Sequence, residues 1–270
     1  MLKFKNSKLI SVSSYNYIVR NYVGSNLDGR KQQEEVEKDW FKPNQVLKKY
    51  HDDLIAKELP HVVYLEGPSG SGKAQLLERL HKLGYETIAQ PYLHFTMEPV
   101  NQKPSKTQQT NWANDINNQI NRFLQKKQSI KNGLIFVHRS PLFSSTLYSN
   151  LCEFEDVDKA VSHINSEYKE NSNNNDNYGE SIIYCKTPEE LIEQRVQGRY
   201  FNSDDVDINK TMKALKQSID VYDRIEKENN IFRATLDTTS VKQSCPGILA
   251  MFDIYFTLSP KFQSILNLKK

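Results

Sequence analysis

The stretch VVYLEGPSGSGKA at residues 62–74 constrains the fold of this chain more than any other feature. The apolar run Val62 to Leu65 predicts a buried strand, and residues 67–73 match the pattern G-x-x-x-x-G-K. Small residues let successive backbone N–H groups converge on an anion, and the following helix directs the positive end of its dipole there. The sequence therefore predicts a nucleotide-binding loop formed by Gly67, Pro68, Ser69, Gly70, Ser71, Gly72, Lys73 and Ala74.

Ala74 departs from this pattern, which usually has Ser or Thr after the lysine to help hold Mg²⁺. The stretch GPSGSGKAQLLERL is similar to the loop of adenylate kinases, where a glycine follows the lysine and Mg²⁺ is held largely through phosphates and water. Those enzymes place a threonine next, whereas this chain has Gln75. ATP is the predicted cofactor, Mg²⁺ has little support from protein ligands, and no metal-ligating residues are predicted.

Apolar runs and helical periodicities alternate along the rest of the chain. Leu76, Leu77, Leu80 and Leu83 form one helical stripe, and Gly84 is placed to end that helix. Strands are predicted at 62–65, 85–89, 134–137, 181–185 and 231–236, helices at 112–124, 154–169, 188–198, 206–222 and 248–258, and a loop at 101–110. Short strands separated by helices predict an α/β fold of three layers, with a five-stranded parallel sheet flanked by helices.

The N-terminal region differs from this domain in composition. Lys3, Lys5, Lys8 and Arg20 precede the first acid, Asp28, as in a mitochondrial transit peptide. The alternative is a basic tail on a cytoplasmic protein. We expect a transit peptide at 1–28, a helical N-terminal extension at 29–59, a P-loop domain at 60–270, and location on the matrix side of mitochondria.

Charge and cysteine usage limit the classes of partner. The net charge of +3 is spread along the 270 residues, which argues against a dedicated nucleic-acid binder. Cys152, Cys185 and Cys245 are far apart, as expected for free thiols in a reducing compartment. No apolar run approaches the ~20 residues that span a bilayer, so the chain is expected not to be transmembrane.

Ordered motifs after the loop carry a resemblance to a known family. The second strand ends in Gln90-Pro91, the stretch WANDIN supplies Trp112 and Asn117, and the third strand ends in His138-Arg139-Ser140. Two arginines four residues apart, Arg195 and Arg199, follow the fourth strand. The stretch FRATLDTTS is similar to a final strand that ends near an aspartate and is followed by the loop that contacts adenine. From about residue 61 to 258 the chain resembles the deoxynucleoside kinase family, in the thymidylate kinase-like branch of P-loop proteins.

This resemblance implies a P-loop kinase fold and phosphoryl transfer from ATP to a nucleoside or nucleoside monophosphate. Such transfer depends mostly on positioning and on neutralising charge on the transferred oxygens. The implied catalytic residues are Lys73, Arg139, Arg195 and Arg199, and the implied acceptor-binding residues are Gln90, Asn117 and Arg139. An arginine after a strand can equally cap a carboxylate, and arginines of the lid region (the segment after the fourth strand) are often solvated.

Three positions depart from the family. The family has a glutamate base where this chain has Gln90, an acid that supports Mg²⁺ where it has His138, and the usual Ser or Thr of the loop where it has Ala74. Loss of a general base alone costs roughly 10²–10⁴-fold in rate. A monophosphate acceptor would need no base, because its attacking oxygen is already anionic.

Three functions therefore remain open at this point. The first is a mitochondrial nucleoside or nucleotide kinase. The second is a kinase-shaped accessory subunit of a mitochondrial complex that can still bind nucleotide, as the resemblance suggests because respiratory complex I of animals contains a deoxynucleoside-kinase-like accessory subunit. The expected protein partner is such a mitochondrial complex or, in a homodimer, a second copy of the chain. The third is a P-loop hydrolase, which would need a carboxylate ending a strand, and Asp237 is the candidate.

Overall fold

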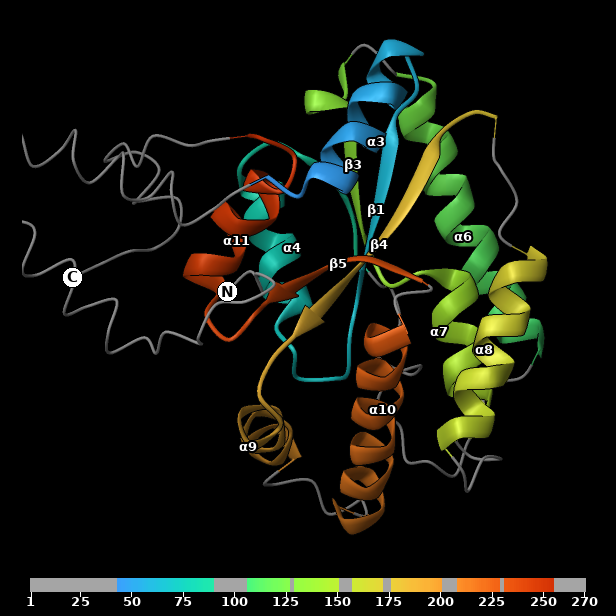
Figure 1. Cartoon of the computed structure of the whole chain (residues 1–270), viewed down its shortest axis with the longest axis vertical. Helices are drawn as coiled ribbons and strands as arrows, with labels where there is room; N and C mark the ends of the chain where they lie inside the picture. The colour runs from blue at the N-terminus through green and yellow to red at the C-terminus, as the bar shows by residue number, and fades with distance from the viewer. Residues whose placement is uncertain are drawn as a thin grey trace, which may run out of the picture.

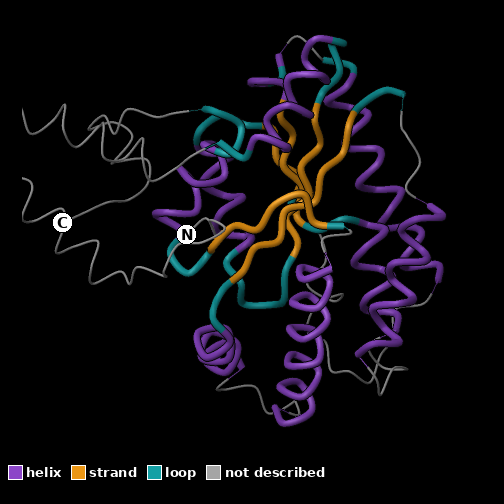
Figure 2. The backbone as a smooth tube through the Cα atoms, in the orientation of Figure 1, coloured by secondary structure: helices purple, strands orange, loops and turns teal. Residues whose placement is uncertain are grey.

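The computed structural model describes residues 43–89, 106–126, 129–150, 157–171, 176–200, 208–228 and 231–254. Its centre is a sheet of five parallel strands in the order β2-β3-β1-β4-β5 (Figures 1 and 2). The strands are β1 (His61–Glu66), β2 (Glu86–Ile88), β3 (Leu134–His138), β4 (Gly179–Lys186) and β5 (Phe232–Asp237). All five predicted strands are confirmed, and so is the α/β fold class.

Strand β1 lies in the middle of this sheet and every one of its residues is buried. It pairs in parallel with β3 on one side, where Leu65 lies opposite His138, and with β4 on the other, where Glu66 lies opposite Tyr184. Parallel strands with helices on both faces are buried on both sides, which explains the continuous apolar run in the sequence. The carboxyl end of β1 therefore opens at the centre of the sheet edge, where ligands of open α/β sheets bind.

Helices cover both faces of the sheet (Figure 1). One apolar core contains Tyr64, Val137 and Tyr184 from the strands and packs against α6 (Lys106–Leu124), α7 (Pro141–Asn150), α8 (Val157–Asn171) and α10 (Ile208–Glu228). The other contains Val63, Leu65 and Phe136 and packs against α4 (Lys73–Lys82) and α11 (Val241–Ala250). Alternate strand residues point to opposite faces, so neighbouring residues at a strand end serve different layers.

A smaller apolar cluster joins α9 (Glu189–Tyr200) to α10. It consists of Ile192 and Val196 from α9 with Leu215 and Ile219 from α10. Figure 1 shows α9 at the carboxyl end of β4, beside the lower part of α10. This pair of helices flanks the phosphate-binding loop.

The N-terminal extension contributes α3 (Gln45–Ala56), which packs on the chain's own domain. Asn44 caps it by accepting from the Leu47 N–H, and the Asn44 N–H donates to the Met251 carbonyl at 3.2 Å. Leu47 and Leu54 are buried. Helix α3 lies within the predicted extension at 29–59, whose bounds stay a prediction, and the predicted transit peptide at 1–28 lies outside the described part of the chain.

Two predictions about helix starts were wrong, and one helix was missed. Helix α6 begins at Lys106, inside the predicted loop 101–110. Helix α7 was not predicted, because PLFSSTLYSN has little contrast between apolar and polar faces. The closing helix α11 (Val241–Ala250) begins before the predicted start at 248 and contains Pro246, a residue that disfavours helix interiors, and residues 255–258 of the predicted helix lie outside the described part of the chain. Across the described segments, no helix combines the length and apolar character that crossing a bilayer requires.

Candidate functional site

The phosphate-binding loop connects β1 to α4 and adopts the backbone that the sequence pattern predicts. Gly67, Gly70 and Gly72 have φ of 147°, 82° and 87°, a region that side chains disfavour. A Cβ atom on Gly67 would lie 2.6 Å from the Cys185 carbonyl oxygen of β4. Glycine at position 67 thus lets the loop leave β1 in close contact with β4.

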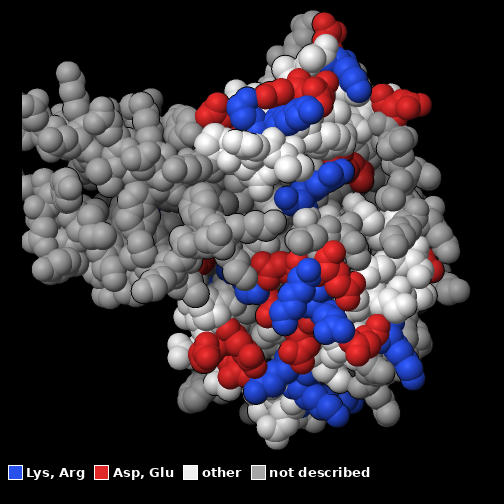
Figure 3. All heavy atoms as spheres, in the orientation of Figure 1, with Lys and Arg blue, Asp and Glu red and all other residues white. Residues whose placement is uncertain are grey.

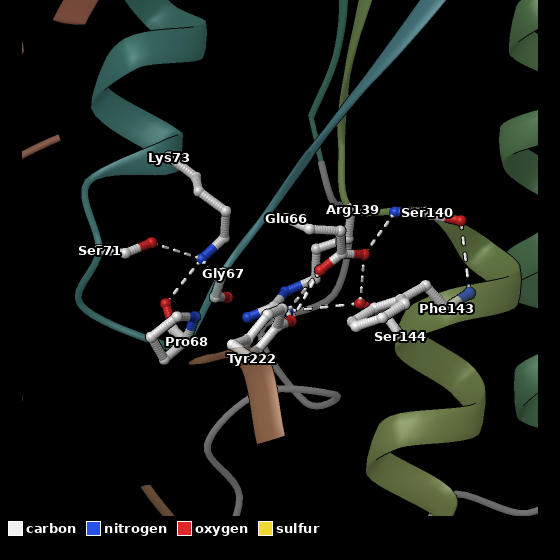
Figure 4. A network of polar contacts seen from close by, with 10 residues as sticks. All are labelled: Glu66, Gly67, Pro68, Ser71, Lys73, Arg139, Ser140, Phe143, Ser144 and Tyr222. Carbon is white, nitrogen blue, oxygen red and sulfur yellow. Dashed lines mark hydrogen bonds and ion pairs between the residues drawn. The ribbon is translucent and has the colours of Figure 1, made fainter. Parts of the chain in front are cut away.

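The carbonyl groups of this loop are held by donors outside the loop backbone. Lys73 Nζ donates to the carbonyls of Gly67 and Pro68, both at 2.7 Å, and to Ser71 Oγ at 3.0 Å (Figure 4). Arg195 Nη1 donates to the Gly70 carbonyl at 2.9 Å, and Thr187 Oγ1 donates to the Ser71 carbonyl at 3.2 Å. A trans peptide points its N–H opposite to its C=O, so these contacts fix the direction of the next N–H groups.

Several backbone N–H groups of the loop are available to bind an anion. Within the described residues, no backbone carbonyl accepts from the N–H groups of Ser69, Gly70 or Gly72. They lie at the N-terminus of α4, where the helix dipole favours negative charge. Together with Lys73, which is 4% exposed, this backbone gathers donors of the kind that bind anions. The residues that the sequence predicts for ATP phosphates are thus brought together.

Glu66 is the main polar residue that sequence reasoning missed. It ends β1 directly before the loop, is fully buried, and accepts from four groups (Figure 4). Oε1 accepts from the Ser140 N–H and the Ser144 hydroxyl, both at 2.7 Å. Oε2 accepts from the Tyr222 hydroxyl at 2.7 Å and lies 3.4 Å from Arg139 Nη1. Because both oxygens of the Glu66 carboxylate accept hydrogen bonds, this side chain connects β1 to α7 and α10.

Arg139 follows β3 and is turned into this network. Its φ of 75° lies in the left-handed region, which costs a non-glycine residue roughly 1–2 kcal/mol. The N–H of Arg139 donates to the Leu65 carbonyl at 3.1 Å, and Nη1 also lies 3.1 Å from the Tyr222 hydroxyl and 3.3 Å from Ser144 Oγ. The side chain is 1% exposed. The structure thus places Arg139 against a carboxylate, and its predicted contact with phosphate stays a prediction.

The side chain of His138 and the hydrogen-bond network of Glu66 and Arg139 lie on opposite faces of the sheet. Strand alternation places it with Leu134 and Phe136, on the side that α4 covers. Burial lowers the pKa of this imidazole well below its usual range, and the positive charges of Lys73 and Arg139 lower it further. His138 is therefore neutral and adds no charge to the site.

The remaining predicted residues are less closely grouped. Ala74 is exposed in the first turn of α4, and Asn117 is exposed on α6. Gln90 lies outside the described residues, and Arg199 belongs to α9 with its side chain outside the described part. Arg195 reaches the loop and also donates from Nη2 to the Thr239 carbonyl at 2.9 Å.

The carboxylate proposed for a hydrolase is separated from the loop. Asp237 ends β5, the edge strand, and β4 lies between β5 and β1. Its Oδ1 accepts from the Thr239 N–H at 2.7 Å. The Asp237 carboxylate thus contacts the turn that follows β5, and its role as a metal ligand stays a prediction. Among the described residues, no three His, Cys, Asp or Glu side chains gather as metal ligands.

The charged surface is composed of mixed pairs. Figure 3 shows basic and acidic side chains next to each other on the face viewed. Lys186 at the end of β4 contacts Asp223 at 2.7 Å and Glu226 at 2.6 Å, and Lys216 contacts Glu193 at 3.0 Å. These pairs link β4 and α9 to α10.

A protein-family comparison accounts for most of this domain. A family model described as an AAA domain, AAA_33, matches residues 62–225, which is more than half of the chain. The chain belongs to this AAA domain family. The matched part of the AAA domain runs from β1 and its phosphate-binding loop through α10, so it contains Lys73, Arg139 and Arg195.

Solved structures similar to this AAA domain include three from bacteria. The YorR protein of Bacillus subtilis, in complex with phosphorylated GDP, is 14% identical with a TM-score of 0.41, over 71% of this chain and 95% of that chain. A deoxyadenosine kinase from M. mycoides with bound dATP is 15% identical with a TM-score of 0.42, over 71% and 99%. A gluconokinase from Sinorhizobium meliloti 1021 is 15% identical with a TM-score of 0.39, over 72% and 93%. No curated protein matches the chain.

Proposed function

We propose that this AAA-domain protein is a nucleoside or nucleotide kinase of the deoxynucleoside kinase type. It binds ATP at residues 67–73 and transfers the terminal phosphoryl group to a (deoxy)nucleoside or a nucleoside monophosphate. The observation that carries the proposal is the loop itself, which holds the Ser69, Gly70 and Gly72 N–H groups and the Lys73 ammonium at the N-terminus of α4. This is the geometry that binds polyphosphate.

The arrangement of charges supports phosphoryl transfer more than simple anion storage. Lys73 can contact the β- and γ-phosphates when its hydrogen bonds to the Gly67 and Pro68 carbonyls are replaced by hydrogen bonds to phosphate oxygens. Arg199 and Arg139 are the proposed further cations, and Gln90 and Asn117 the proposed acceptor contacts. Bound ATP would supply the phosphoryl group, and Mg²⁺ would arrive with its phosphates.

The neutral His138 and the absence of an acid at position 90 favour a monophosphate acceptor. The attacking oxygen of a monophosphate is already anionic, so the protein need not remove a proton from it. A nucleoside acceptor would require a base that these positions do not supply.

Transfer from radiolabelled ATP to a panel of nucleosides and nucleoside monophosphates tests the proposal. Labelled product is expected with at least one monophosphate and is expected to disappear in Lys73→Ala. The matched control is Lys82→Ala, which removes an exposed lysine from the same helix that pairs with Glu78 on the surface. Equal product from wild type and Lys73→Ala would contradict transfer at this site.

A second function has its own supporting observation. Arg139 is tied to Glu66 and Tyr222 inside the protein, and Ala74 offers no hydroxyl to a metal. These features suit a kinase-fold subunit of a mitochondrial complex, such as respiratory complex I, that binds nucleotide without transferring phosphate. The acid-free stretch before Asp28 supports targeting to the mitochondrial matrix. Native mass in cell extracts distinguishes the two functions, since the subunit would migrate in a large complex and the enzyme as a small species.

A further inference from the structure

Arg195 occupies an unusual place for an arginine of the lid region. Its guanidinium lies between two loops that are far apart in the sequence, donating from Nη1 to the Gly70 carbonyl and from Nη2 to the Thr239 carbonyl, both at 2.9 Å. The side chain is half-buried. Because a planar guanidinium offers donors in a fixed fork, the two carbonyls are held at a set separation.

Packing around Gly70 reinforces this contact. A Cβ atom on Gly70 would lie 3.2 Å from both the Ile192 carbonyl and Val196 Cγ2, so α9 rests directly on the top of the loop. Ile192 and Val196 belong in turn to the apolar cluster that joins α9 to α10. The position of the loop is therefore coupled to the helix that carries Arg195.

A second connection runs parallel to the first. Thr187, two residues before α9, donates to the Ser71 carbonyl and exchanges a hydrogen bond of 2.9 Å with the hydroxyl of Thr238. The Thr238 N–H donates to the Lys186 carbonyl at 2.8 Å. Holding the Ser71 carbonyl toward Thr187 turns the Gly72 N–H the opposite way, into the loop. The turn at 238–240 and the loop are thus joined at two points.

We propose that Arg195 is a positioning residue that couples the phosphate-binding loop to the turn at 238–240. Anion binding that orders residues 67–73 also orders this turn, through Arg195 and, in parallel, through Thr187. The part of the inference that concerns ligand rests on the proposed nucleotide binding, in which the turn would lie beside the base. Arg195 acts on the loop through backbone carbonyls, instead of contacting phosphate directly.

Hydrogen–deuterium exchange of the full chain without ligand tests the connection itself. Arg195→Gln is expected to speed exchange by about tenfold in peptides covering both 67–73 and 237–241, because two charge-assisted hydrogen bonds are lost. Arg195→Lys, which keeps the charge and can reach one carbonyl, is expected to give a smaller change. The control is Lys216→Gln, an exposed residue of α10 that contacts α9 through Glu193 and Glu189 without touching the loop, and it is expected to change neither peptide.

Inorganic tripolyphosphate, which has no base, tests the coupling. In wild type it is expected to slow exchange in both 67–73 and 237–241. In the double variant Arg195→Gln/Thr187→Val it is expected to slow exchange in 67–73 alone. The coupling would be overturned if tripolyphosphate still slowed exchange of 237–241 in the double variant. It would also be overturned if tripolyphosphate slowed exchange of 67–73 in wild type and left exchange of 237–241 unchanged. No protection of 67–73 in wild type would instead refute the proposed anion site, and the ligand-free comparison would still decide the connection. Unchanged exchange in Arg195→Gln would refute the connection.

Discussion

Nη1 of Arg139 lies 3.4 Å from Oε2 of Glu66, and the two side chains are 1% and 0% exposed. This pair joins Glu66, the last residue of β1, to Arg139, the first residue after β3. The phosphate-binding loop begins at the residue that follows Glu66. Tyr222 of α10 donates to the same carboxylate oxygen. The loop therefore starts from a position fixed by three elements.

Glu66→Gln tests what this buried pair contributes to stability. The substitution leaves the Arg139 guanidinium buried without a carboxylate, which is expected to cost about 3–5 kcal/mol of unfolding free energy. Urea unfolding followed by circular dichroism measures the change. Arg139→Met in the same chain is expected to recover part of the loss, because the uncompensated charge is then gone. A loss below about 1 kcal/mol in the single variant would contradict a structural role for the pair.

Glu180 gives the opposite expectation for the same chemical change. Burial raises the pKa of this carboxyl above its usual value, and the Tyr64 hydroxyl donates to it at 3.0 Å. The charged form is thus disfavoured in the folded protein, and stability falls as pH rises through the folded pKa. Glu180→Gln is expected to raise the unfolding free energy at pH 7, with a gain that vanishes below pH 4. Urea unfolding at the two pH values measures it, and a loss at pH 7 would contradict it.

The histidine pair under α3 predicts a pH dependence of the opposite sign. His61 Nδ1 lies 3.2 Å from His51 Nδ1, and His61 Nε2 lies 2.8 Å from Ser181 Oγ. Burial lowers the pKa of His61 from 6.5 to about 3, with smaller effects of His51 and Arg233. The unfolded chain therefore binds more protons between these values, and the contribution of His61 is full above pH 6.5 and is lost as pH falls toward 3.

The corresponding measurement compares wild type with His61→Gln. One histidine contributes a slope of about 1.4 kcal/mol per pH unit within that window. The difference in unfolding free energy between pH 6 and pH 4.5 is expected to be smaller in the variant by about 2 kcal/mol, which is this slope over 1.5 pH units. Identical pH profiles for the two proteins would show that His61 does not titrate as its surroundings indicate.

Ala74→Ser tests whether the missing hydroxyl limits metal use. Ala74 is exposed at the position where P-loop proteins place the hydroxyl that holds Mg²⁺. The variant is expected to bind ATP several-fold more tightly in Mg²⁺ and unchanged in EDTA, as calorimetric titration would show. Gln75→Ser, one residue along the helix, is the control and should show no Mg²⁺-dependent gain. A gain of equal size in EDTA would contradict a role for the hydroxyl in metal binding.

Much of the fold follows from local patterns. The glycine-rich turn after Val62 to Leu65, and Gly84 with φ of 85° at the end of α4, are encoded by neighbouring residues and were predicted correctly. Helix α7 was missed because its residues show no amphipathic period. Its role becomes visible only through Ser144, which donates to Glu66 of a distant strand.

The site was harder to predict, because its key contacts join distant parts of the chain. Glu66 appeared to be an ordinary strand end, since Tyr222 and Arg139 lie far from it in the sequence. Arg195 was implied by the family resemblance, but that resemblance does not indicate its contacts with the backbone carbonyls of Gly70 and Thr239. A carboxylate directly before a phosphate-binding loop was the one available signal for Glu66.

Calorimetric titration of ATP into the full chain is the most direct test of the central claim, that the loop at 67–73 grips a polyphosphate. Saturable binding is expected for wild type, with affinity reduced at least about tenfold in Lys73→Ala, because a buried charge-assisted contact is removed. Adenosine, which lacks phosphates, is expected to bind far more weakly than ATP. No saturable binding of ATP, or equal affinity in wild type and Lys73→Ala, would contradict the account.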